Sequence, residues 1–152
     1  MKYLNSVYAL VACTIFILDI ITKRWALSVC QQEVVINQFF SCELVMNRGF
    51  SWSMLHSSSP ELFMLVNTII IAAVIILGNY TYYQWQLSKN IMGEVIVMTG
   101  ALANMLDRKL YGGVVDFIVV HYHECAWPVF NVADMAVVIG VFIMLYTNWN
   151  AD

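Results

Sequence analysis

The fold is decided by residues 62–78, which read LFMLVNTIIIAAVIILG and contain no charged side chain. A helix rises about 1.5 Å per residue, so a run of this kind can cross a hydrocarbon core about 30 Å thick. Pro60 and Glu61 come immediately before the run and suit the first turn of a helix. Aromatic residues between Tyr80 and Trp85 follow it and are typical of a membrane interface. The stretch therefore predicts a transmembrane helix.

The composition of the whole chain agrees with this prediction. Of the 152 residues, 61% are hydrophobic and 11% are charged, and the mean hydropathy is +0.73. A soluble domain is about 45–50% apolar and about 25% charged. The chain has 7 Lys and Arg against 10 Asp and Glu, which excludes a basic nucleic-acid-binding protein. Its apolar content excludes disorder, and its length predicts one integral-membrane domain, residues 1–152.

Three further apolar runs, at about residues 3–21, 91–110 and 129–149, predict helices of the same kind. Together with residues 62–78 they predict a membrane all-α fold, a four-transmembrane-helix bundle. The first run has a second interpretation, because Leu10-Val11-Ala12-Cys13 resembles the cleavage site of a lipoprotein signal peptide. The residues after Cys13 stay apolar, so an uncleaved first span is favoured.

The segments between the runs differ in kind. Residues 24–59 include Val34-Val35-Ile36 and Glu43-Leu44-Val45, which favour short strands. Gly112-Gly113 ends the third predicted helix, and residues 114–123 alternate loosely, as an extended segment does. Residues 79–90 are long enough only for a short turn. The sequence thus predicts two longer connectors with some extended structure.

Four spans that alternate across a bilayer place most charged residues on one side. That side holds Asp19, Lys23, Arg24, Glu33, Glu43, Arg48, Glu61, Asp107, Arg108, Lys109, Asp116, Glu124 and Asp134. The other side holds Lys2, Lys89, Glu94 and Asp152. This asymmetry favours a functional site at one membrane surface over a small transporter, which needs polar residues reaching toward both faces.

Two of these acidic residues have the character of a reactive pair. Asp134 lies more than a turn inside the fourth predicted span, where an ionisable group is a functional-site hypothesis by default. The alternative is a structural ion pair that fixes helix packing. Asp116, on the preceding connector, can meet Asp134, and two carboxyl groups brought close share a proton. One group can then act as a base on water while the other donates a proton to a carbonyl oxygen, which is the chemistry of peptide hydrolysis.

Five polar segments occur in order along the chain. They are Asp19-x-x-Thr22-Lys23, Asn47-Arg48-Gly49-x-Ser51, Asn104-Met105-Leu106-Asp107-Arg108, Gly113-Val114-Val115-Asp116-Phe117 and Phe130-Asn131-Val132-Ala133-Asp134. Together they resemble the signature motifs of the lipoprotein signal peptidase family (signal peptidase II). The resemblance implies an aspartyl endopeptidase that removes the signal peptide from diacylglyceryl-modified prolipoproteins, cutting before the lipidated cysteine.

The resemblance also implies a role for each motif residue. Asp116 and Asp134 correspond to the catalytic dyad. Asn104, Arg108 and Asn131 are expected to position the substrate backbone and the dyad. Asp107 is expected to support the outer end of the third span. Asp19, Lys23 and Asn47 are expected around the substrate pocket. Thr99 and Ala103, the residues Arg48-Gly49-Phe50-Ser51-Trp52 after Asn47, and Met135 depart from the usual family residues. A catalytically silent membrane scaffold or lipoprotein-binding protein of the same fold is therefore the alternative function.

The family's other properties complete the expectation. It implies a small extracytoplasmic β-cradle formed by residues 24–59 and a lid loop formed by residues 111–128. The partners it implies are diacylglyceryl prolipoproteins, membrane lipids and inhibitors of the globomycin type, with no cofactor, metal or nucleic acid. A monomer is expected in the bacterial inner (cytoplasmic) membrane, multi-pass, with the active site at the extracytoplasmic face and both termini in the cytoplasm.

The basic residues argue for the opposite orientation. The motif-rich side carries Lys23, Arg24, Arg48, Arg108 and Lys109, and the other side carries Lys2 and Lys89. The positive-inside tendency would place the motif-rich side in the cytoplasm. Several of these basic residues belong to the motifs, so site function can explain their position. We therefore follow the orientation of the family.

Two weaker patterns point to other chemistry, and the cysteines and Asn67 have structural interpretations. His121-x-His123-Glu124-Cys125 contains metal-ligating residue types, but no second ligand set accompanies it. Ser51, Ser53 or Ser57 could pair with a histidine, but no Gly-x-Ser-x-Gly turn is present. A bridge between Cys30 and Cys42 is one alternative on the predicted oxidising side, although free buried thiols are favoured. Asn67, inside an apolar run, is predicted to form a hydrogen bond between helices.

Overall fold

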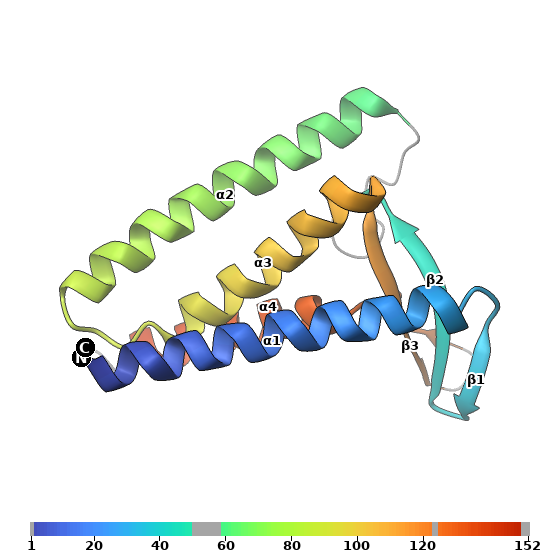
Figure 1. The fold of residues 1–152 in the computed structure, drawn as a ribbon, viewed down its shortest axis with the longest axis horizontal. Coiled ribbons are helices and arrows are strands. Elements are labelled where there is room, and N and C mark those ends of the chain that lie inside the picture. The colour runs from blue at the N-terminus through green and yellow to red at the C-terminus, as the bar shows by residue number, and fades with distance from the viewer. Residues whose placement is uncertain (1, 50–58, 123–124, 150–152) are drawn as a thin grey trace.

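The structure, a computed structural model, describes residues 2–49, 59–122 and 125–149. In these residues the chain forms four helices, α1 (Lys2–Val29), α2 (Pro60–Gln86), α3 (Met92–Tyr111) and α4 (Val132–Trp149). The helices extend along the molecule, and a small sheet lies across one end of them (Figure 1). The start of α1 and the turn between α2 and α3 lie at the opposite end. The two longer connectors therefore meet at one end of the helices.

Helices α1 and α2 extend further than the apolar runs that predict them, whereas α4 begins at Val132, three residues later than predicted. Helix α1 continues beyond Ile21 to Val29, because Lys23 forms an ion pair with Asp19 one turn earlier and neither charge has to end the helix. Helix α2 continues through the aromatic residues to Gln86. It begins after Ser59, whose hydroxyl oxygen accepts a hydrogen bond from the amide of Leu62.

Two helices in the described part of the chain are long and apolar enough to cross a membrane. They are Tyr3–Val29 and Pro60–Gln86, with mean hydropathies of 2.0 and 2.4 in their most apolar windows. Most side chains in these windows are exposed, unlike those of a core helix in a soluble protein. Residues Val132–Thr147 of α4 form a shorter apolar helix. The exposed surface of α1 and α2 thus has the character of a surface in contact with lipid.

The sheet has the strand order β1-β2-β3-β4, and each neighbouring pair is antiparallel. Its strands are β1 (Val34–Asn37), β2 (Phe40–Asn47), β3 (Val114–Tyr122) and β4 (Cys125–Ala126). Strands predicted within residues 24–59 and the extended segment that starts at residue 114 are confirmed. The cradle is expected at residues 24–59 and the lid loop at residues 111–128. Strand β3 pairs with β2, so most of the lid segment belongs to the same sheet as the cradle.

Cys30 and Cys42 form a disulfide, with their Cα atoms 5.6 Å apart, so the expectation of free thiols is wrong. Because α1 continues to Val29, Cys30 emerges beside β2, where its carbonyl oxygen accepts a hydrogen bond from the amide of Leu44. The disulfide packs with Ala26 and Phe117 in a small core between the end of α1 and the sheet. This core fixes the sheet against the helices.

Helices α3 and α4 approach each other closely through glycines. A Cβ atom added to Gly100 would lie 2.5 Å from the carbonyl oxygen of Ala133, and one added to Gly140 would lie 2.8 Å from the backbone nitrogen of Val97. Such distances leave no room for a side chain. The close contact brings Asn104 on α3 next to the start of α4.

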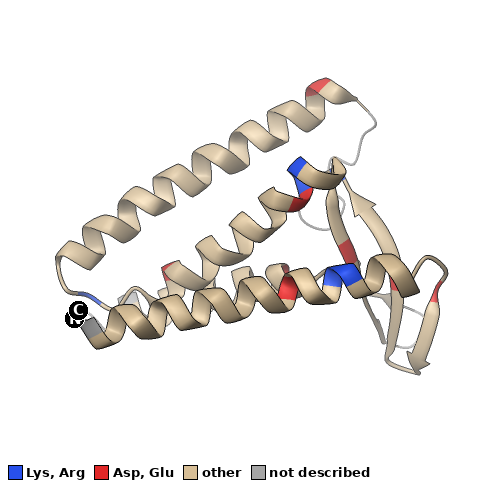
Figure 2. Ribbon diagram, in the orientation of Figure 1, with Lys and Arg blue, Asp and Glu red and all other residues tan. Residues whose placement is uncertain are grey.

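The charged side chains gather where the sheet meets the helices. Figure 2 shows the acidic and basic residues concentrated at the sheet end, with long uncharged stretches of helix beyond them. The predicted asymmetry of charge is therefore present in the folded chain. The carboxyl groups singled out from the sequence lie at this end.

Candidate active site

Asp116 is held in place by the backbone on both sides of β3. Helix α3 ends at Gly112, whose φ of 70° lies in the left-handed region that favours glycine, and the chain then reverses into β3. Asp116 lies opposite Val45 in the β2–β3 pairing. Further along β3, the amide of Ile118 donates a hydrogen bond of 2.8 Å to the carbonyl oxygen of Phe130. This bridge brings the residues that begin α4 alongside Asp116.

Asn131 and Asp134 cap the start of α4 reciprocally. Oδ1 of Asn131 accepts a hydrogen bond of 2.8 Å from the amide of Asp134. Oδ2 of Asp134 accepts one of 3.3 Å from the amide of Asn131. This is the geometry of a capping box, which satisfies two amides at a helix start. It places the Asp134 carboxylate in the first turn, where the helix dipole favours negative charge.

Asn131 also joins the two acidic residues. Its Nδ2 atom donates a hydrogen bond of 2.6 Å to Oδ1 of Asp116, while its backbone amide serves Asp134. Each carboxyl group receives a second amide donor, from Asn47 Nδ2 at 2.9 Å to Asp116 and from Asn104 Nδ2 at 2.8 Å to Asp134. The arrangement holds both carboxyl groups in fixed orientations through three asparagines.

The environment of Asp116 favours its protonated form. The side chain is 2% exposed, and this burial raises the pKa of Asp116 to about 7, with the charge of Asp134 as the next cause. The hydrogen bonds from Asn47 and Asn131 act in the opposite direction but do not cancel the rise. Near neutral pH, Asp116 can therefore keep a proton. The side chain of Asp134 is half-buried, so it is less shielded from water than that of Asp116.

Lys23 is the centre of a second cluster behind the acidic pair. Its Nζ atom lies 2.7 Å from Oδ2 of Asp19 and 2.8 Å from Oδ2 of Asp107, and it donates a hydrogen bond of 2.9 Å to Oδ1 of Asn104. Oδ1 of Asp19 accepts a hydrogen bond of 2.8 Å from the amide of Ala133 in the first turn of α4. The cluster thus fixes α1 and α3 against the start of α4 and orients the amide that reaches Asp134.

Arg108 lies at the same end of the site as the two carboxyl groups. Its guanidinium donates hydrogen bonds to the carbonyl oxygens of Arg48 and Gly49 and to Oδ1 of Asn67. It also lies over the ring of Phe63, 5.8 Å from the ring centre. Arg108 therefore links α3 to α2 and to the chain that leaves β2.

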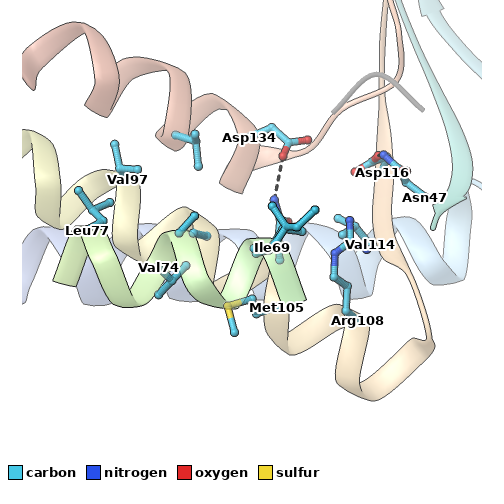
Figure 3. A pocket seen from close by; sticks show the side chains of 15 residues that line it. Asn47, Ile69, Val74, Leu77, Val97, Met105, Arg108, Val114, Asp116 and Asp134 are labelled. Atoms are coloured by element: carbon cyan, nitrogen blue, oxygen red, sulfur yellow. Dashed lines mark hydrogen bonds between the residues drawn. The ribbon is translucent and has the colours of Figure 1, made fainter. Parts of the chain in front are cut away.

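A cavity of about 280 Å³ connects the acidic pair to an apolar surface (Figure 3). Asp116, Asp134 and Arg108 lie at one end of it, and Val74, Leu77 and Val97 lie toward the other end. The remaining lining residues are Asn47, Ile69, Ile70, Ala73, Ala101, Asn104, Met105, Val114 and Val137. The cavity thus has a polar end with two carboxyl groups and an apolar body formed by α2, α3 and α4.

The structure brings the predicted site residues together in two layers. Those that line the cavity are Asn47, Asn104, Arg108, Asp116 and Asp134. Asp19, Lys23 and Asp107 were expected around the pocket and the outer end of a span, but they lie behind the cavity wall in the Lys23 cluster. Sequence reasoning missed the α2 lining, Ile69 to Leu77, although a stripe at helical spacing was the available signal.

The competing patterns are placed elsewhere. Nε2 of His121 lies 2.8 Å from Oγ of Ser41. The carboxylate of Glu33 approaches the same ring nitrogen at 3.9 Å, so it does not orient the opposite nitrogen as a serine hydrolase requires. Ser51, Ser53 and Ser57 lie outside the described residues, as do His123 and Glu124 of the metal-like pattern.

The geometry of the site suits acid–base chemistry on a polar bond. Two carboxyl groups face one cavity, one of them favours the protonated form, and amide donors hold both. Such a pair can activate water and donate a proton to a carbonyl oxygen without a covalent intermediate. The apolar body of the cavity suits a ligand with an apolar part next to the reacting group.

Comparison with known proteins identifies a family that matches the motifs. A family model described as signal peptidase (SPase) II matches residues 11–150. The lipoprotein signal peptidase of Teredinibacter turnerae is 35% identical, with 96% of this chain and 91% of that protein covered. That of Dichelobacter nodosus is 32% identical, with 93% and 92% covered. These matches extend over nearly the whole chain.

A solved structure has the same fold. A bacterial membrane enzyme, determined by the in meso method at 2.3 Å resolution, superposes with a TM-score of 0.76 and 25% sequence identity. The match covers 95% of this chain and 88% of the solved one. A second, at 1.9 Å resolution, gives a TM-score of 0.74. The arrangement of helices and sheet is therefore that of a known membrane enzyme.

Proposed function

The chain belongs to the signal peptidase II family, and from this membership we propose how the carboxyl groups of Asp116 and Asp134 act. It is a membrane aspartic endopeptidase that removes signal peptides from prolipoproteins. The observation that carries the proposed mechanism is that Asn131 hydrogen-bonds to both Asp116 and Asp134 at the polar end of an apolar cavity. These two residues are the catalytic dyad of the proposal.

The dyad carries one proton in the proposed reaction. Asp134 accepts a proton from water as the water oxygen attacks the carbonyl carbon of the scissile peptide bond. Asp116 donates its proton to the carbonyl oxygen, which gives a tetrahedral diol. The intermediate then collapses: Asp134 gives its proton to the leaving nitrogen, and Asp116 regains one as the new carboxyl group forms. The proton distribution is supported by the burial and raised pKa of Asp116 and by the helix start beneath Asp134.

The remaining motif residues hold this pair. Asn131, Asn47 and Asn104 fix the carboxyl oxygens, since each donates an amide hydrogen to one of them. Lys23 orients Asn104 and neutralises two buried carboxylates. Arg108 lines the polar end of the cavity, where it can contact the substrate backbone. Lys23, its acidic partners and the three asparagines are therefore positioning residues in this proposal, while Arg108 binds substrate.

The substrate of the proposal is a diacylglyceryl-modified prolipoprotein, cut immediately before the lipidated cysteine. The cavity supports this choice, because its apolar body can take the hydrophobic segment of a signal peptide while its polar end takes the peptide bond. The outer surface of α2 is apolar, so the acyl chains of the substrate can stay in the surrounding lipid next to it. The sheet, formed by parts of residues 24–59 and 111–128, would act as cradle and lid over this end.

We propose a topology in which all four helices span the bacterial inner membrane, with the sheet on the extracytoplasmic side and both termini in the cytoplasm. The Cys30–Cys42 disulfide supports it, since disulfides persist in oxidising compartments. Two of the five basic residues on that side have a local cause for their position. Lys23 is buried in ion pairs, and Arg108 is bound to backbone carbonyls, so site structure rather than orientation fixes both.

The proposed assembly is a monomer that works without a cofactor and binds globomycin-type inhibitors in the cavity. A catalytically silent scaffold is not favoured. The relatives at 30–35% identity over most of the chain are named as peptidases, and the contacts around Asn47, Asn104 and Asp134 are intact. Gly100 keeps α3 and α4 in close contact beside Thr99, one of the residues that depart from the family pattern.

The function is tested with purified full-length protein in detergent. A diacylglyceryl prolipoprotein and the same prolipoprotein without the lipid are incubated with it, and loss of the signal peptide is followed by gel shift. The proposal expects cleavage of the lipidated substrate only, and protection by globomycin. Absence of cleavage in vitro, together with failure to restore lipoprotein maturation in cells depleted of their own enzyme, would support the scaffold instead.

A further inference from the structure

A second groove lies between α2 and α3, outside the catalytic cavity. We call it the side groove; it has a volume of about 260 Å³ and is lined by Asn67, Ile71, Met105, Arg108 and Lys109. Its residues on α2 are one turn apart and differ from the α2 residues that line the catalytic cavity. One end of the groove is basic and polar, and the other end is apolar.

The basic end of the side groove has carboxylates near Arg108 (Asp116, Asp134 and Asp107), but within the described residues none of them is paired with Arg108 or Lys109. The guanidinium of Arg108 donates to uncharged oxygens, one of them Oδ1 of Asn67 at 3.5 Å. Lys109 is exposed in the last turn of α3. Among residues 2–49, 59–122 and 125–149, no carboxylate forms an ion pair with either cation. Two positive charges therefore lie side by side along the chain, open to an anionic ligand.

We propose that the side groove binds an anionic phospholipid of the surrounding membrane. Its phosphate contacts Lys109, Arg108 and the amide of Asn67, and an acyl chain lies along Ile71 and Met105. The two positive charges favour a negatively charged headgroup. The apolar half of the groove favours a lipid, which has an acyl chain, over a free inorganic anion, which has none. Lysine can reach the headgroup level while its methylenes stay in apolar surroundings. The proposal requires that α2 and α3 lie in a membrane, but it does not depend on the catalytic dyad.

Lys109 is the residue to test, because Arg108 also lines the catalytic cavity. Full-length protein in a nonionic detergent is titrated with phosphatidylglycerol, and native mass spectrometry measures the bound lipid. Lys109→Gln is compared with Lys89→Gln, which removes the same charge from the exposed turn between α2 and α3. A basic residue near an anionic lipid surface is worth about 1 kcal/mol, so Lys109→Gln is expected to weaken binding about fivefold. Lys89→Gln is expected to bind as wild type does.

Three further comparisons separate the sources of binding. Lys109→Arg keeps the charge and is expected to restore wild-type affinity. Phosphatidylcholine, whose headgroup is neutral overall, is expected to bind more weakly, and excess inorganic phosphate is expected not to displace the lipid. Equal lipid binding by Lys109→Gln and Lys89→Gln would overturn the proposal. The role of Lys109 would then be limited to a favourable interaction with the dipole at the C-terminal end of α3. Displacement by inorganic phosphate would also overturn it, in favour of a simple anion site.

Discussion

The side-chain amide of Asn131 donates a hydrogen bond of 2.6 Å to Oδ1 of Asp116, so the residue that caps α4 also holds the carboxyl group on β3. The backbone amide of Asn131 donates a hydrogen bond to Oδ2 of Asp134. Helix capping and orientation of the dyad are therefore one structural feature. Changes at Asn131 are expected to affect stability and turnover together.

Replacing Asn131 with Ala removes both functions. Loss of a helix cap costs about 1–2 kcal/mol of stability, and displacement of a catalytic group by about 1 Å can cost 100-fold in rate. We expect Asn131→Ala to lower the unfolding temperature and to reduce turnover about 100-fold. Ser59→Ala is the matched control, because it removes the side-chain cap of α2 away from the dyad. Ser59→Ala should lose stability with little loss of turnover; equal turnover losses in the two variants would contradict this role of Asn131.

Replacing Lys23 with Met leaves two buried carboxylates without their cation. Removal of one partner from a buried ion pair costs about 3–5 kcal/mol, so Lys23→Met is expected to unfold at a markedly lower temperature in detergent. Arg24→Met removes a neighbouring exposed charge and is expected to change stability little. Comparable unfolding temperatures for the two variants would show that the Lys23 cluster does not hold α1 and α3 to α4.

The proton on Asp116 gives stability a characteristic pH dependence. Burial, followed by the charge of Asp134, raises the pKa of Asp116 from 3.8 to about 7. Between these values the folded protein binds more protons than the unfolded chain, so stability falls as pH rises toward 7, by at most about 1.4 kcal/mol per pH unit. Turnover is expected to fall above pH 7, because the dyad then loses its shared proton.

Thermal unfolding of Asp116→Asn across pH 4 to 8 checks this dependence. The variant cannot titrate at this position and should show a smaller loss of stability with rising pH than wild type. Glu43→Gln, which removes an exposed carboxylate from β2, should keep the wild-type slope. Identical slopes in wild type and Asp116→Asn would show that Asp116 is already ionised well below pH 7.

The disulfide between Cys30 and Cys42 is expected to stabilise the sheet against α1. It closes a loop with a sequence separation of 12, for which chain entropy predicts about 3 kcal/mol. A variant with both residues changed to Ser should unfold at a lower temperature than wild type, and reductant should affect only wild type. Cys13→Ser, at an exposed position in α1, serves as the control and should match wild type. Insensitivity of wild type to reductant would count against the bridge.

The apolar runs and the motif spacing predict much of this structure. Helix positions follow from hydropathy, because burial in lipid or against another helix requires long apolar stretches. The sequence also pairs Asp134 with Asp116, because a carboxyl group inside an apolar span is costly and marks a functional site, and Asp116 precedes it on the adjoining connector. The structure places both at one end of one cavity.

Other features depend on contacts that no local pattern contains. The apolar run ends before α1 does, because the ion pair between Asp19 and Lys23 hides both charges inside the fold. The position of Cys30 depends on this longer α1, so the apolar run alone does not place Cys30 beside Cys42. The role of Lys23 behind the cavity depends on Asp107, far away in sequence, and only the packing of α1 on α3 brings them together.

Turnover of the two dyad variants tests the central claim most directly. Asp116→Asn and Asp134→Asn keep the shape of each side chain, and cleavage of a diacylglyceryl prolipoprotein by each is compared with that by Glu43→Gln. General acid–base catalysis typically contributes a factor of about 10²–10⁴ per group, so both variants should lose at least that much turnover while remaining folded. Glu43→Gln should cleave as wild type does. Wild-type turnover by either folded dyad variant would contradict the account.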